Sequence, residues 1–476
     1  MLGVFDEGRL ALEEIHRFPN GAVRLHGSLR WDLLGLYREM LHGFRLVAAR
    51  GLPIAGLGVD SWAIDYGLRR GHEPLLRPAY HYRDPRHDKA FRAARNPLFD
   101  QLVFAHTGIQ FLSINTIYQL LADQAQGDGM LEIADRLLLI PDWFHFLLCG
   151  CEAAEESNAS TTQLYDPRLR QWSDELITRL GFPRRIFADL VPPGTVLAPL
   201  RPEVREQTGL GEVPVIAGCT HDTAAAVAAV PAQGEDWAYL SSGTWSLIGV
   251  ELNGPLINEA VQAANFTNEV GYGGTIRFLK NIIGLWLLQE CRRAWGREGH
   301  DLDYAKLAEL AATATPLKSL IHPDDSRFQA PEDMPAAIRA YCLETSQPAP
   351  GTPGEFARCI FESLALLYRV RLDELERLTG RKVRVLHIVG GGSRNEVLNQ
   401  CAADATGREV LAGPVEATAL GNVLSQSLAL GHICDLAAAR EIVRASFAVH
   451  TCHPQEPELW SQARDRFARL PVGRTY

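Results

Sequence analysis

Residues 238–252 read AYLSSGTWSLIGVEL, in which two serines, a glycine and a threonine separate two runs of alternating apolar and polar side chains. Such alternation predicts a pair of β-strands, and the Ser-Gly dipeptide between them is a common hairpin turn. A turn of glycine and small hydroxyl residues also suits an anion, because the backbone can closely approach phosphate oxygens. The stretch therefore predicts two paired strands whose connection is either a plain hairpin or a phosphate-binding turn.

Outward from this strand pair, strand-like and helix-like segments alternate along the whole chain. Apolar runs predict buried strands at residues 54–60 and 213–218, and another directly before the triple glycine at 390–392. Helical spacing of apolar residues predicts a long amphipathic helix over 358–378, and a helical region runs through 114–150. Alternation of this kind predicts an α/β architecture with largely parallel sheets.

The length and composition limit the classes of protein that the chain can be. The chain of 476 residues is longer than one ordinary domain. At roughly 100–200 residues per domain, its length predicts two or three domains. Pro, Gly and two acidic residues in PAQGEDW, residues 231–237, predict a boundary between domains at 1–232 and 233–476. The net charge of -10, with no stripe of lysine and arginine, argues against a nucleic-acid partner.

Membrane and metal-binding patterns are not evident in the sequence. No apolar run reaches the roughly 18 residues that span a bilayer, and residues 1–30 carry charges throughout, so we expect a cytoplasmic protein without a membrane partner. The nine cysteines contain no Cys-x-x-Cys pair, and one residue separates the nearest two, Cys149 and Cys151. We therefore expect reduced, mostly buried thiols and neither a zinc site nor a disulfide framework.

Two further turns follow predicted strands, where ligands commonly bind in open α/β sheets. In GCTHDTAAAV, residues 218–227, Asp222 is either an N-cap of the alanine-rich helix or a site residue beside His221. In HIVGGGSRNEVLNQ, residues 387–400, three glycines leave no side chain between backbone and ligand. The latter lacks the GxGxxG and Walker A spacings, and it predicts a nucleotide or phosphate contact.

A third turn, GPVEATALGN at residues 413–422, precedes a predicted helix with Glu416 in its first turn. Its simplest interpretation is a capped helix in which Gly421 allows close packing.

Seven separated motifs together resemble the FGGY family of carbohydrate kinases in order and character: GVDSWAIDYG, GIQFLSINTIYQL, GCTHDTAAAV, YLSSGTWSLIGVEL, LKNIIGLWLLQ, LHIVGGGSRNEVLNQ and AGPVEATALGN. The resemblance covers nearly all of the chain from Glu14 onward. It implies an actin-like, hexokinase-like (ribonuclease H-like) α/β fold of two domains with a central cleft. It also implies phosphorylation of the primary hydroxyl of a ketose by ATP and Mg²⁺, in a monomer or weak homo-oligomer. The expected ketose is L-rhamnulose, with fuculose and xylulose as alternatives.

Site residues can be carried over from the family motif by motif. The resemblance implies Asp222 as the catalytic base and, as residues that bind the sugar, Ala63, His221, Thr223 and Asn281. It implies nucleotide binding by Thr244, Gln289 and Gly391, which favours the phosphate-binding alternative for the opening stretch. Because Asp222 lies at a predicted helix start, where the helix dipole favours the ionised form, we expect it to be a weak base that acts by position.

The sequence departs from the family pattern in two places. The family begins with an Asp-bearing strand and a Gly/Ser-rich phosphate-binding hairpin, whereas MLGVFDEGRLALEEIHRF resembles the strand after that hairpin. Either the true start lies upstream of Met1 or the protein is shortened, and we expect the chain as written to be poorly active or a non-catalytic binding protein. Ala63 stands where the pattern has a glycine, so its methyl group can crowd the sugar. Asp65 is a candidate hydroxyl partner, as are Asp84 and Arg83, for which a surface ion pair is the alternative.

Overall fold

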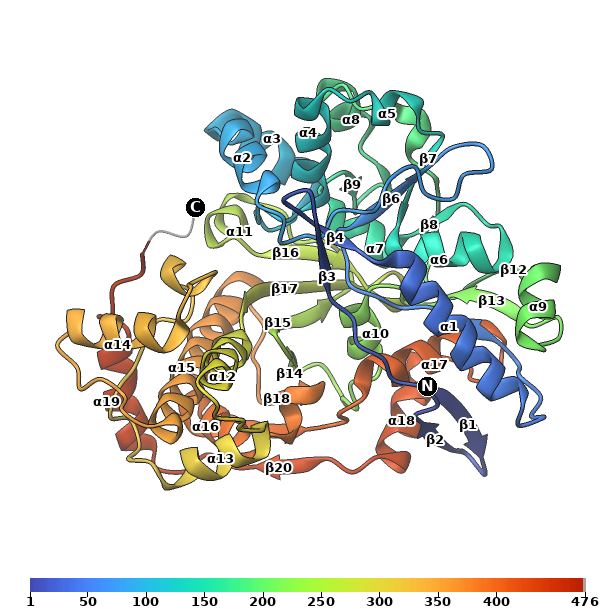
Figure 1. Ribbon diagram of the computed structural model, residues 1–476. Helices are drawn as coiled ribbons and strands as arrows, with labels where there is room; N and C mark the ends of the chain where they lie inside the picture. Colours follow the sequence, from blue (N-terminus) through green and yellow to red (C-terminus); the bar gives the residue numbers. More distant parts are fainter. Residues whose placement is uncertain (474–476) are drawn as a thin grey trace. The chain divides into compact units, whose positions relative to one another are not determined.

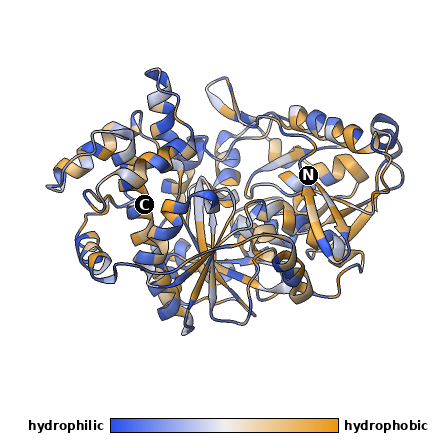
Figure 2. Cartoon of the chain, turned by 90° about the horizontal axis from the view of Figure 1, so that it is seen from below, coloured by the Kyte–Doolittle hydropathy of each residue, from blue (hydrophilic) through white to orange (hydrophobic). Residues whose placement is uncertain are grey.

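The computed structural model describes residues 1–473 and divides into two compact units (Figure 1). Unit 1 consists of Met1–Ala229, Glu251–Phe278 and Thr418–Ser446. Unit 2 consists of Val230–Val250, Leu279–Ala417 and the chain from Phe447 onward. Strands and helices alternate in both units, so the predicted α/β architecture is confirmed. The expectation of largely parallel sheets was wrong, because antiparallel pairs such as β1 with β2, β12 with β13 and β14 with β15 outnumber the parallel ones among the described strands. Many helices carry hydrophobic residues beside hydrophilic ones (Figure 2), as expected where one face of a helix covers a core.

A three-stranded sheet positions the main loops of unit 1. Strand β13 (Pro214–Ala217) pairs in parallel with β5 (Leu57–Gly58) and antiparallel with β12 (Thr195–Pro199). The predicted strand at 213–218 is thus confirmed, and Val215 and Ile216 within it are fully buried. Because β5 and β13 run in the same direction, the loops that follow them leave the sheet at one edge.

The other elements of unit 1 surround this sheet. Its helices are α1 (Leu33–Ala48), α2 (Arg86–Ala94), α3 (Pro97–Thr107), α4 (Thr116–Gln126), α5 (Met130–Ile133), α6 (Ile140–Cys149), α7 (Glu156–Ala159), α8 (Asp174–Arg179), α9 (Pro202–Thr208), α10 (Asp222–Ala228), α11 (Glu259–Ala264), α17 (Ala417–Ala429) and α18 (Leu436–Ser446). Its other strands are β1 (Leu2–Asp6), β2 (Arg9–Glu13), β3 (Ala22–Leu25), β4 (Ser28–Trp31), β6 (Tyr66–Arg69), β7 (Arg136–Leu139), β8 (Ala153–Glu155), β9 (Tyr165–Asp166), β10 (Gln171–Trp172), β11 (Asp189–Val191) and β16 (Thr267–Val270). Strands β1 and β2 pair with each other as a separate two-stranded sheet.

The strands of unit 2 pair in a larger sheet in the order β17-β15-β14-β18-β19-β20. The predicted strand pair is confirmed as β14 (Trp237–Ser242) and β15 (Trp245–Leu252), which are antiparallel. Strand β18 (Val385–Val389) lies parallel to β14, with Ser241 opposite Val389, so both strands end at the same edge. The remaining strands are β17 (Ile276–Ile283), β19 (Glu409–Ala412) and β20 (His450–Cys452).

A long helix forms much of the core of unit 2. Helix α15 (Pro353–Thr379) begins with a capping box between Thr352 and Glu355, and Gly380 ends it in a left-handed conformation. The predicted amphipathic helix is therefore confirmed, and α15 packs against α13 (Tyr304–Thr313) and α16 (Glu396–Thr406). The other helices are α12 (Trp286–Arg297), α14 (Met334–Glu344) and α19 (Pro457–Phe467). Among the helices of residues 1–473, none is long and apolar enough to cross a membrane.

Four local predictions were wrong. The buried strand predicted at 54–60 comprises only Leu57–Gly58, and of these residues only Leu57 is buried. The helical region predicted through 114–150 is interrupted by β7, which pairs with β6. The N-cap of α10 is His221, and Asp222 is the first helical residue. Glu416 precedes α17 and does not lie in its first turn.

Candidate functional site

Two loops of unit 1 are joined backbone to backbone beyond β5 and β13. The amide of Ser61 donates to the carbonyl of Thr220 at 2.9 Å, and the amide of Asp222 donates to the carbonyl of Ser61 at 2.9 Å. These two hydrogen bonds continue the parallel pairing of the strands by one bridge, between Ser61 and His221. Ala63 follows Ser61 by two residues and is half-buried. It therefore lies next to the residue that pairs with the Asp222 loop.

The carboxyl group of Asp222 lies at the start of α10 and is open to a ligand. Its Oδ1 accepts the amide of Thr223 at 2.5 Å and the Thr223 hydroxyl at 3.1 Å, while 45% of its side chain is exposed. Desolvation by the surrounding protein raises the pKa of Asp222 above its ordinary value, although the hydrogen bonds from Thr223 oppose the rise. The expectation that the helix start makes Asp222 a weak base was therefore wrong in direction.

His221 is held next to Asp222 in one protonation state. Burial, with Arg277 nearby, lowers the pKa of His221 well below its ordinary value, so the ring is neutral at pH 7. The Nη2 of Arg277 donates to Nδ1 of His221 at 3.0 Å, and because a guanidinium cannot accept, Nδ1 is the unprotonated nitrogen. The proton is therefore on Nε2, which lies 3.3 Å from Oδ1 of Asp222.

A buried ion pair supports His221 from behind. Arg277 is fully buried, its Nη1 lies 3.1 Å from Oε2 of Glu269, and its Nε donates to the carbonyl of Val270 at 3.2 Å. These residues lie on β17 and β16. The pair neutralises both charges in the core and fixes the ring nitrogen that faces away from Asp222.

A second buried carboxylate holds the loop before Asp222. Glu155 is fully buried at the end of β8 and accepts the amide and hydroxyl of Ser157 and of Thr220, at distances between 2.5 and 3.1 Å. The Ser157 hydroxyl in turn accepts the amide of His221 at 3.2 Å. These bonds satisfy the polar groups of a loop that carries no regular structure.

A third carboxylate, Asp60, lies two residues beyond the end of β5, directly before Ser61. It accepts a hydrogen bond from the side-chain amide of Asn422 on α17. Burial raises the pKa of Asp60 to about 6, and the negative charge of Asp222 contributes to the rise. Two carboxyl groups of the site thus repel each other electrostatically.

The acidic residues that the sequence offered as hydroxyl partners do not serve that purpose. Asp65 is fully buried and accepts four hydrogen bonds from the protein, so a sugar cannot reach it. Asp84 is buried and accepts the amides of Leu29 at 2.7 Å and Arg86 at 3.0 Å. Asp84 is therefore a turn-stabilising residue, and the surface ion pair considered for it was also wrong.

The residues assigned to the nucleotide lie in unit 2. Thr244 occupies the turn between β14 and β15, and Nε2 of Gln289 donates to its hydroxyl at 3.0 Å. The Thr244 carbonyl accepts the amides of Gly284 at 3.2 Å and Trp286 at 3.1 Å, which fixes the turn against the start of α12. Asn281, predicted to contact sugar, is half-buried on β17 in the same unit. The structure thus brings Thr244 and Gln289 together, while His221, Asp222 and Thr223 form a separate group in unit 1.

The three glycines after β18 have different surroundings. A Cβ at Gly392 would lie 2.0 Å from Oγ of Ser242, so close packing of β14 and the turn requires this glycine. Gly390 has a φ of +85°, and its Cβ would lie 3.1 Å from the carbonyl oxygen of Ser242. A Cβ at Gly391 would meet nothing within 4 Å, and the residue is exposed. Only the middle glycine therefore presents free backbone to a ligand.

We predict that Gly391→Ala raises the KM for ATP by about tenfold while leaving the unfolding temperature unchanged. The methyl group would obstruct a ligand against the backbone without meeting protein atoms. Gly392→Ala is the matched comparison, because the same methyl group would collide with Ser242 and destabilise unit 2. Thermal unfolding and steady-state kinetics of both variants check this, and an unchanged KM in Gly391→Ala would contradict it.

Sequence reasoning missed Arg277, Glu269, Glu155 and Asp60 as members of the site. Asp60 was recognisable as the residue that ends a buried strand, the position at which ligands gather. The others carried no comparable signal, because their roles depend on buried partners far along the chain.

In the described residues, no three or more His, Cys, Asp or Glu side chains are grouped so as to hold a metal ion.

Comparison with known proteins places both halves of the chain in one family. The N-terminal domain model of the FGGY family of carbohydrate kinases matches residues 42–229, and its C-terminal domain model matches residues 238–430. A rhamnulokinase from Bacteroides thetaiotaomicron is 45% identical over 98% of this chain and 96% of that protein. Rhamnulokinases from Pectobacterium atrosepticum and Bacillus subtilis are 46% and 40% identical, over 97% and 96% of this chain and 91% and 93% of those proteins.

Solved structures share the fold at low sequence identity. A ligand-bound xylulose kinase from Lactobacillus acidophilus has a TM-score of 0.78 at 17% identity, covering 94% of this chain and 90% of that chain. A gluconate kinase from the same organism has a TM-score of 0.79 at 16% identity, covering 97% and 92%. These likenesses confirm the expected actin-like, ribonuclease H-like α/β fold.

Proposed function

This chain belongs to the FGGY family of carbohydrate kinases, and from that premise we propose that it transfers the γ-phosphoryl group of ATP to L-rhamnulose, giving L-rhamnulose 1-phosphate. The observation that carries this proposal is the 40–46% identity to rhamnulokinases over nearly the full length of both partners. We assign sugar binding to residues 1–232 and nucleotide binding to 233–476, in line with the two family domains.

Asp222 is the proposed general base. As the bond forms between the sugar's primary hydroxyl oxygen and the γ-phosphorus, the hydroxyl proton passes to the Asp222 carboxylate and ADP leaves with the bonding electrons. The exposed carboxylate is accessible to that hydroxyl, and its raised pKa makes it a better proton acceptor than an ordinary aspartate. The Nε2–H of His221 can donate to a sugar oxygen and orient it, with Thr223 holding the carboxylate from the other side.

Mg²⁺ fits the carboxyl groups that this site contains. The cation commonly uses one or two protein carboxylates together with phosphate oxygens, and Asp60 is the one that would hold it while Asp222 takes the proton. Mg²⁺ supplies neutralisation of the phosphate charge when it is bound. Thr244, Gln289 and Gly391 are the proposed ATP-binding residues of unit 2.

The experiment that tests the function is ADP release with ATP, Mg²⁺ and a panel of L-rhamnulose, fuculose and xylulose. We expect kcat/KM to be highest for L-rhamnulose, and a preference for either other ketose would overturn the substrate assignment.

A further inference from the structure

Four aromatic rings stack beside the loop that carries the proposed base. Trp62 directly follows Ser61, whose backbone pairs with Thr220 and Asp222. The ring centroids of Trp62 and Trp31 are 4.0 Å apart, those of Trp31 and His81 are 4.1 Å apart, and those of His81 and Tyr82 are 4.6 Å apart. The stack therefore begins at the residue between the Ser61 bridge and Ala63.

One buried carboxylate holds this stack together. Oδ2 of Asp65 accepts Nε1 of Trp31 at 2.6 Å, Nε1 of Trp62 at 3.0 Å and the amide of Tyr82 at 3.1 Å. Its Oδ1 accepts Nε2 of Gln119 at 2.8 Å. Both indole N–H groups are thus turned inward onto the same oxygen, which fixes the orientation of both rings and leaves their outer surfaces apolar.

The two ends of the stack are less buried than its middle. Trp31 and His81 are buried, whereas Trp62 and Tyr82 are half-buried, and Trp62 is the end nearest the base. Burial lowers the pKa of His81 to about 4, so the imidazole in the middle of the stack is uncharged at neutral pH. Trp62 therefore presents a rigid, neutral aromatic surface next to the loop that would bind a sugar.

This surface suits one chemical feature of the proposed substrate. L-rhamnulose is a 6-deoxyketose, so its C6 is a methyl group, whereas L-fructose is the same ketose with a hydroxyl on C6. A methyl group packs favourably on an indole face, but a hydroxyl placed there would lose its water without gaining a hydrogen bond, since the indole N–H is already donated to Asp65.

We propose that Trp62 is the residue that selects a 6-deoxyketose, by packing its indole face against the C6 methyl group, and that Asp65 is a positioning residue that holds the indole in place. The inference rests on the proposed function, because it concerns the sugar of that reaction. Asp65 thereby acquires a role although it cannot touch the sugar.

The test compares kcat/KM for L-rhamnulose and L-fructose in the full chain and in four variants. Trp62→Ala removes the surface, Trp62→Phe keeps a ring without the N–H, and Asp65→Asn replaces one of the two accepting oxygens by an N–H₂ donor. Tyr304→Ala, which removes a ring that is 45% exposed on α13, is the control for loss of an aromatic side chain.

We expect the full chain to prefer L-rhamnulose by about tenfold or more, and Trp62→Ala to lose most of this preference. Trp62→Phe, which keeps a ring but loses the N–H held by Asp65, and Asp65→Asn should each reduce the preference by less than Trp62→Ala does, and Tyr304→Ala should match the full chain. If Trp62 were merely structural, its loss would lower kcat/KM for both sugars by the same factor. An unchanged ratio of the two kcat/KM values in Trp62→Ala would therefore overturn the inference. If Trp62→Ala does not fold, an unaltered ratio in Asp65→Asn overturns the role of Asp65, and an unaltered ratio in Trp62→Phe overturns the role of the held indole. Failure of the full chain to phosphorylate either sugar would instead overturn the proposed function, and the inference with it.

Discussion

Asp222→Asn is expected to lower kcat for L-rhamnulose phosphorylation by about 10²- to 10⁴-fold, the usual contribution of a general base. Asparagine has nearly the same shape as aspartate and can keep the bond that Oδ1 accepts from the Thr223 amide. It cannot take the hydroxyl proton as the new bond to phosphorus forms. The KM for the sugar should change much less than kcat, because the loss concerns the transition state.

Stability should move in the opposite direction to activity. The pKa of Asp222 is raised in the folded protein, so ionisation is less favourable there than in the unfolded chain, whose pKa is near 3.8. The ionised carboxylate therefore lowers stability at pH 7, and this penalty disappears below the unfolded pKa, where both states are protonated. We expect Asp222→Asn to unfold at the same temperature as the native chain or at a higher one.

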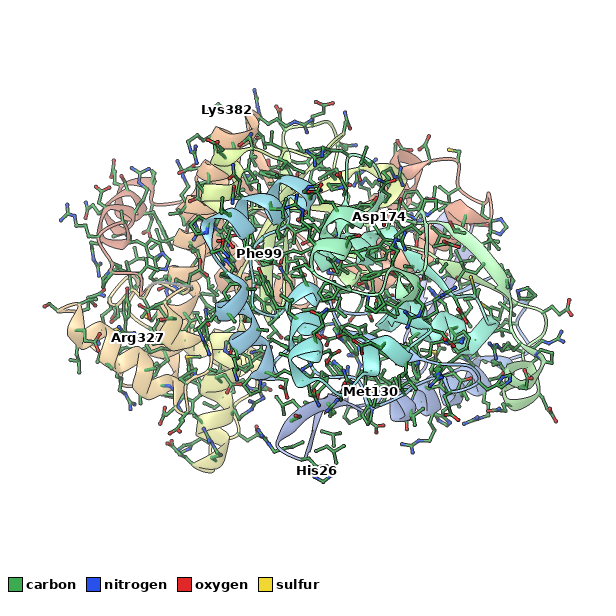
Figure 3. The ribbon with its side chains drawn as sticks, turned by 90° about the horizontal axis from the view of Figure 1, so that it is seen from above. His26, Phe99, Met130, Asp174, Arg327 and Lys382 are labelled. Atoms are coloured by element: carbon green, nitrogen blue, oxygen red, sulfur yellow. The ribbon has the colours of Figure 1, made fainter. Side chains whose placement is uncertain are left out.

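Asp174→Asn is the matched control for the loss of one carboxylate (Figure 3, where Asp174 is labelled). Its side chain is 68% exposed at the start of α8 and pairs with Arg184 at the surface, so kcat and unfolding temperature should both stay unchanged. Steady-state ADP release and thermal unfolding at pH 7 check both expectations. If Asp222→Asn kept more than about a tenth of the native kcat, Asp222 would not be the base.

The fold was predictable where a local pattern and the tertiary structure agree. Strands β13, β14 and β18 and helix α15 each carry their own periodicity and flanking turn residues, and each occurs as predicted. The segment 136–139 was predicted to be helical but forms a strand, because a short buried strand and a buried helix have similar apolar compositions. Its strand conformation comes from pairing with β6, where Leu139 lies opposite Tyr66, a partner more distant than any local pattern reaches.

Site residues were predictable from the sequence only where they stand together in one motif. His221, Asp222 and Thr223 stand in one motif, and the structure gives them mutual contacts. Arg277 looks like a solvated charge in the sequence, yet it is fully buried, and its interaction with His221 joins residues 56 positions apart. Asp65 shows the converse error, because a carboxylate near a predicted ligand loop was taken for a ligand contact although it is buried beneath the indoles.

Gly421→Ala is expected to destabilise the protein by about 3 kcal/mol or more, at the upper end of overpacking effects. A Cβ at Gly421 on α17 would lie 1.7 Å from the carbonyl oxygen of Ala225 on α10 and 2.4 Å from its carbonyl carbon. Both contacts are to backbone of a helix, which cannot rotate away as a flexible side chain would. Helix α10 would have to shift as a whole, and since Asp222 is its first residue, kcat should fall as well.

Gly43→Ala provides the control, because the same change is made within helix α1 of the same unit. A Cβ at Gly43 would meet nothing closer than 3.7 Å, so the usual helix preference for alanine should stabilise that variant by about 0.5–1 kcal/mol. The two substitutions are chemically identical and opposite in expected sign, which separates packing from helix propensity. Denaturant unfolding with parallel kinetics measures both effects. Equal stability of Gly421→Ala and the native chain would mean that α10 and α17 are not in backbone contact at this glycine, and that the base is positioned by the Ser61 and Glu155 bonds alone.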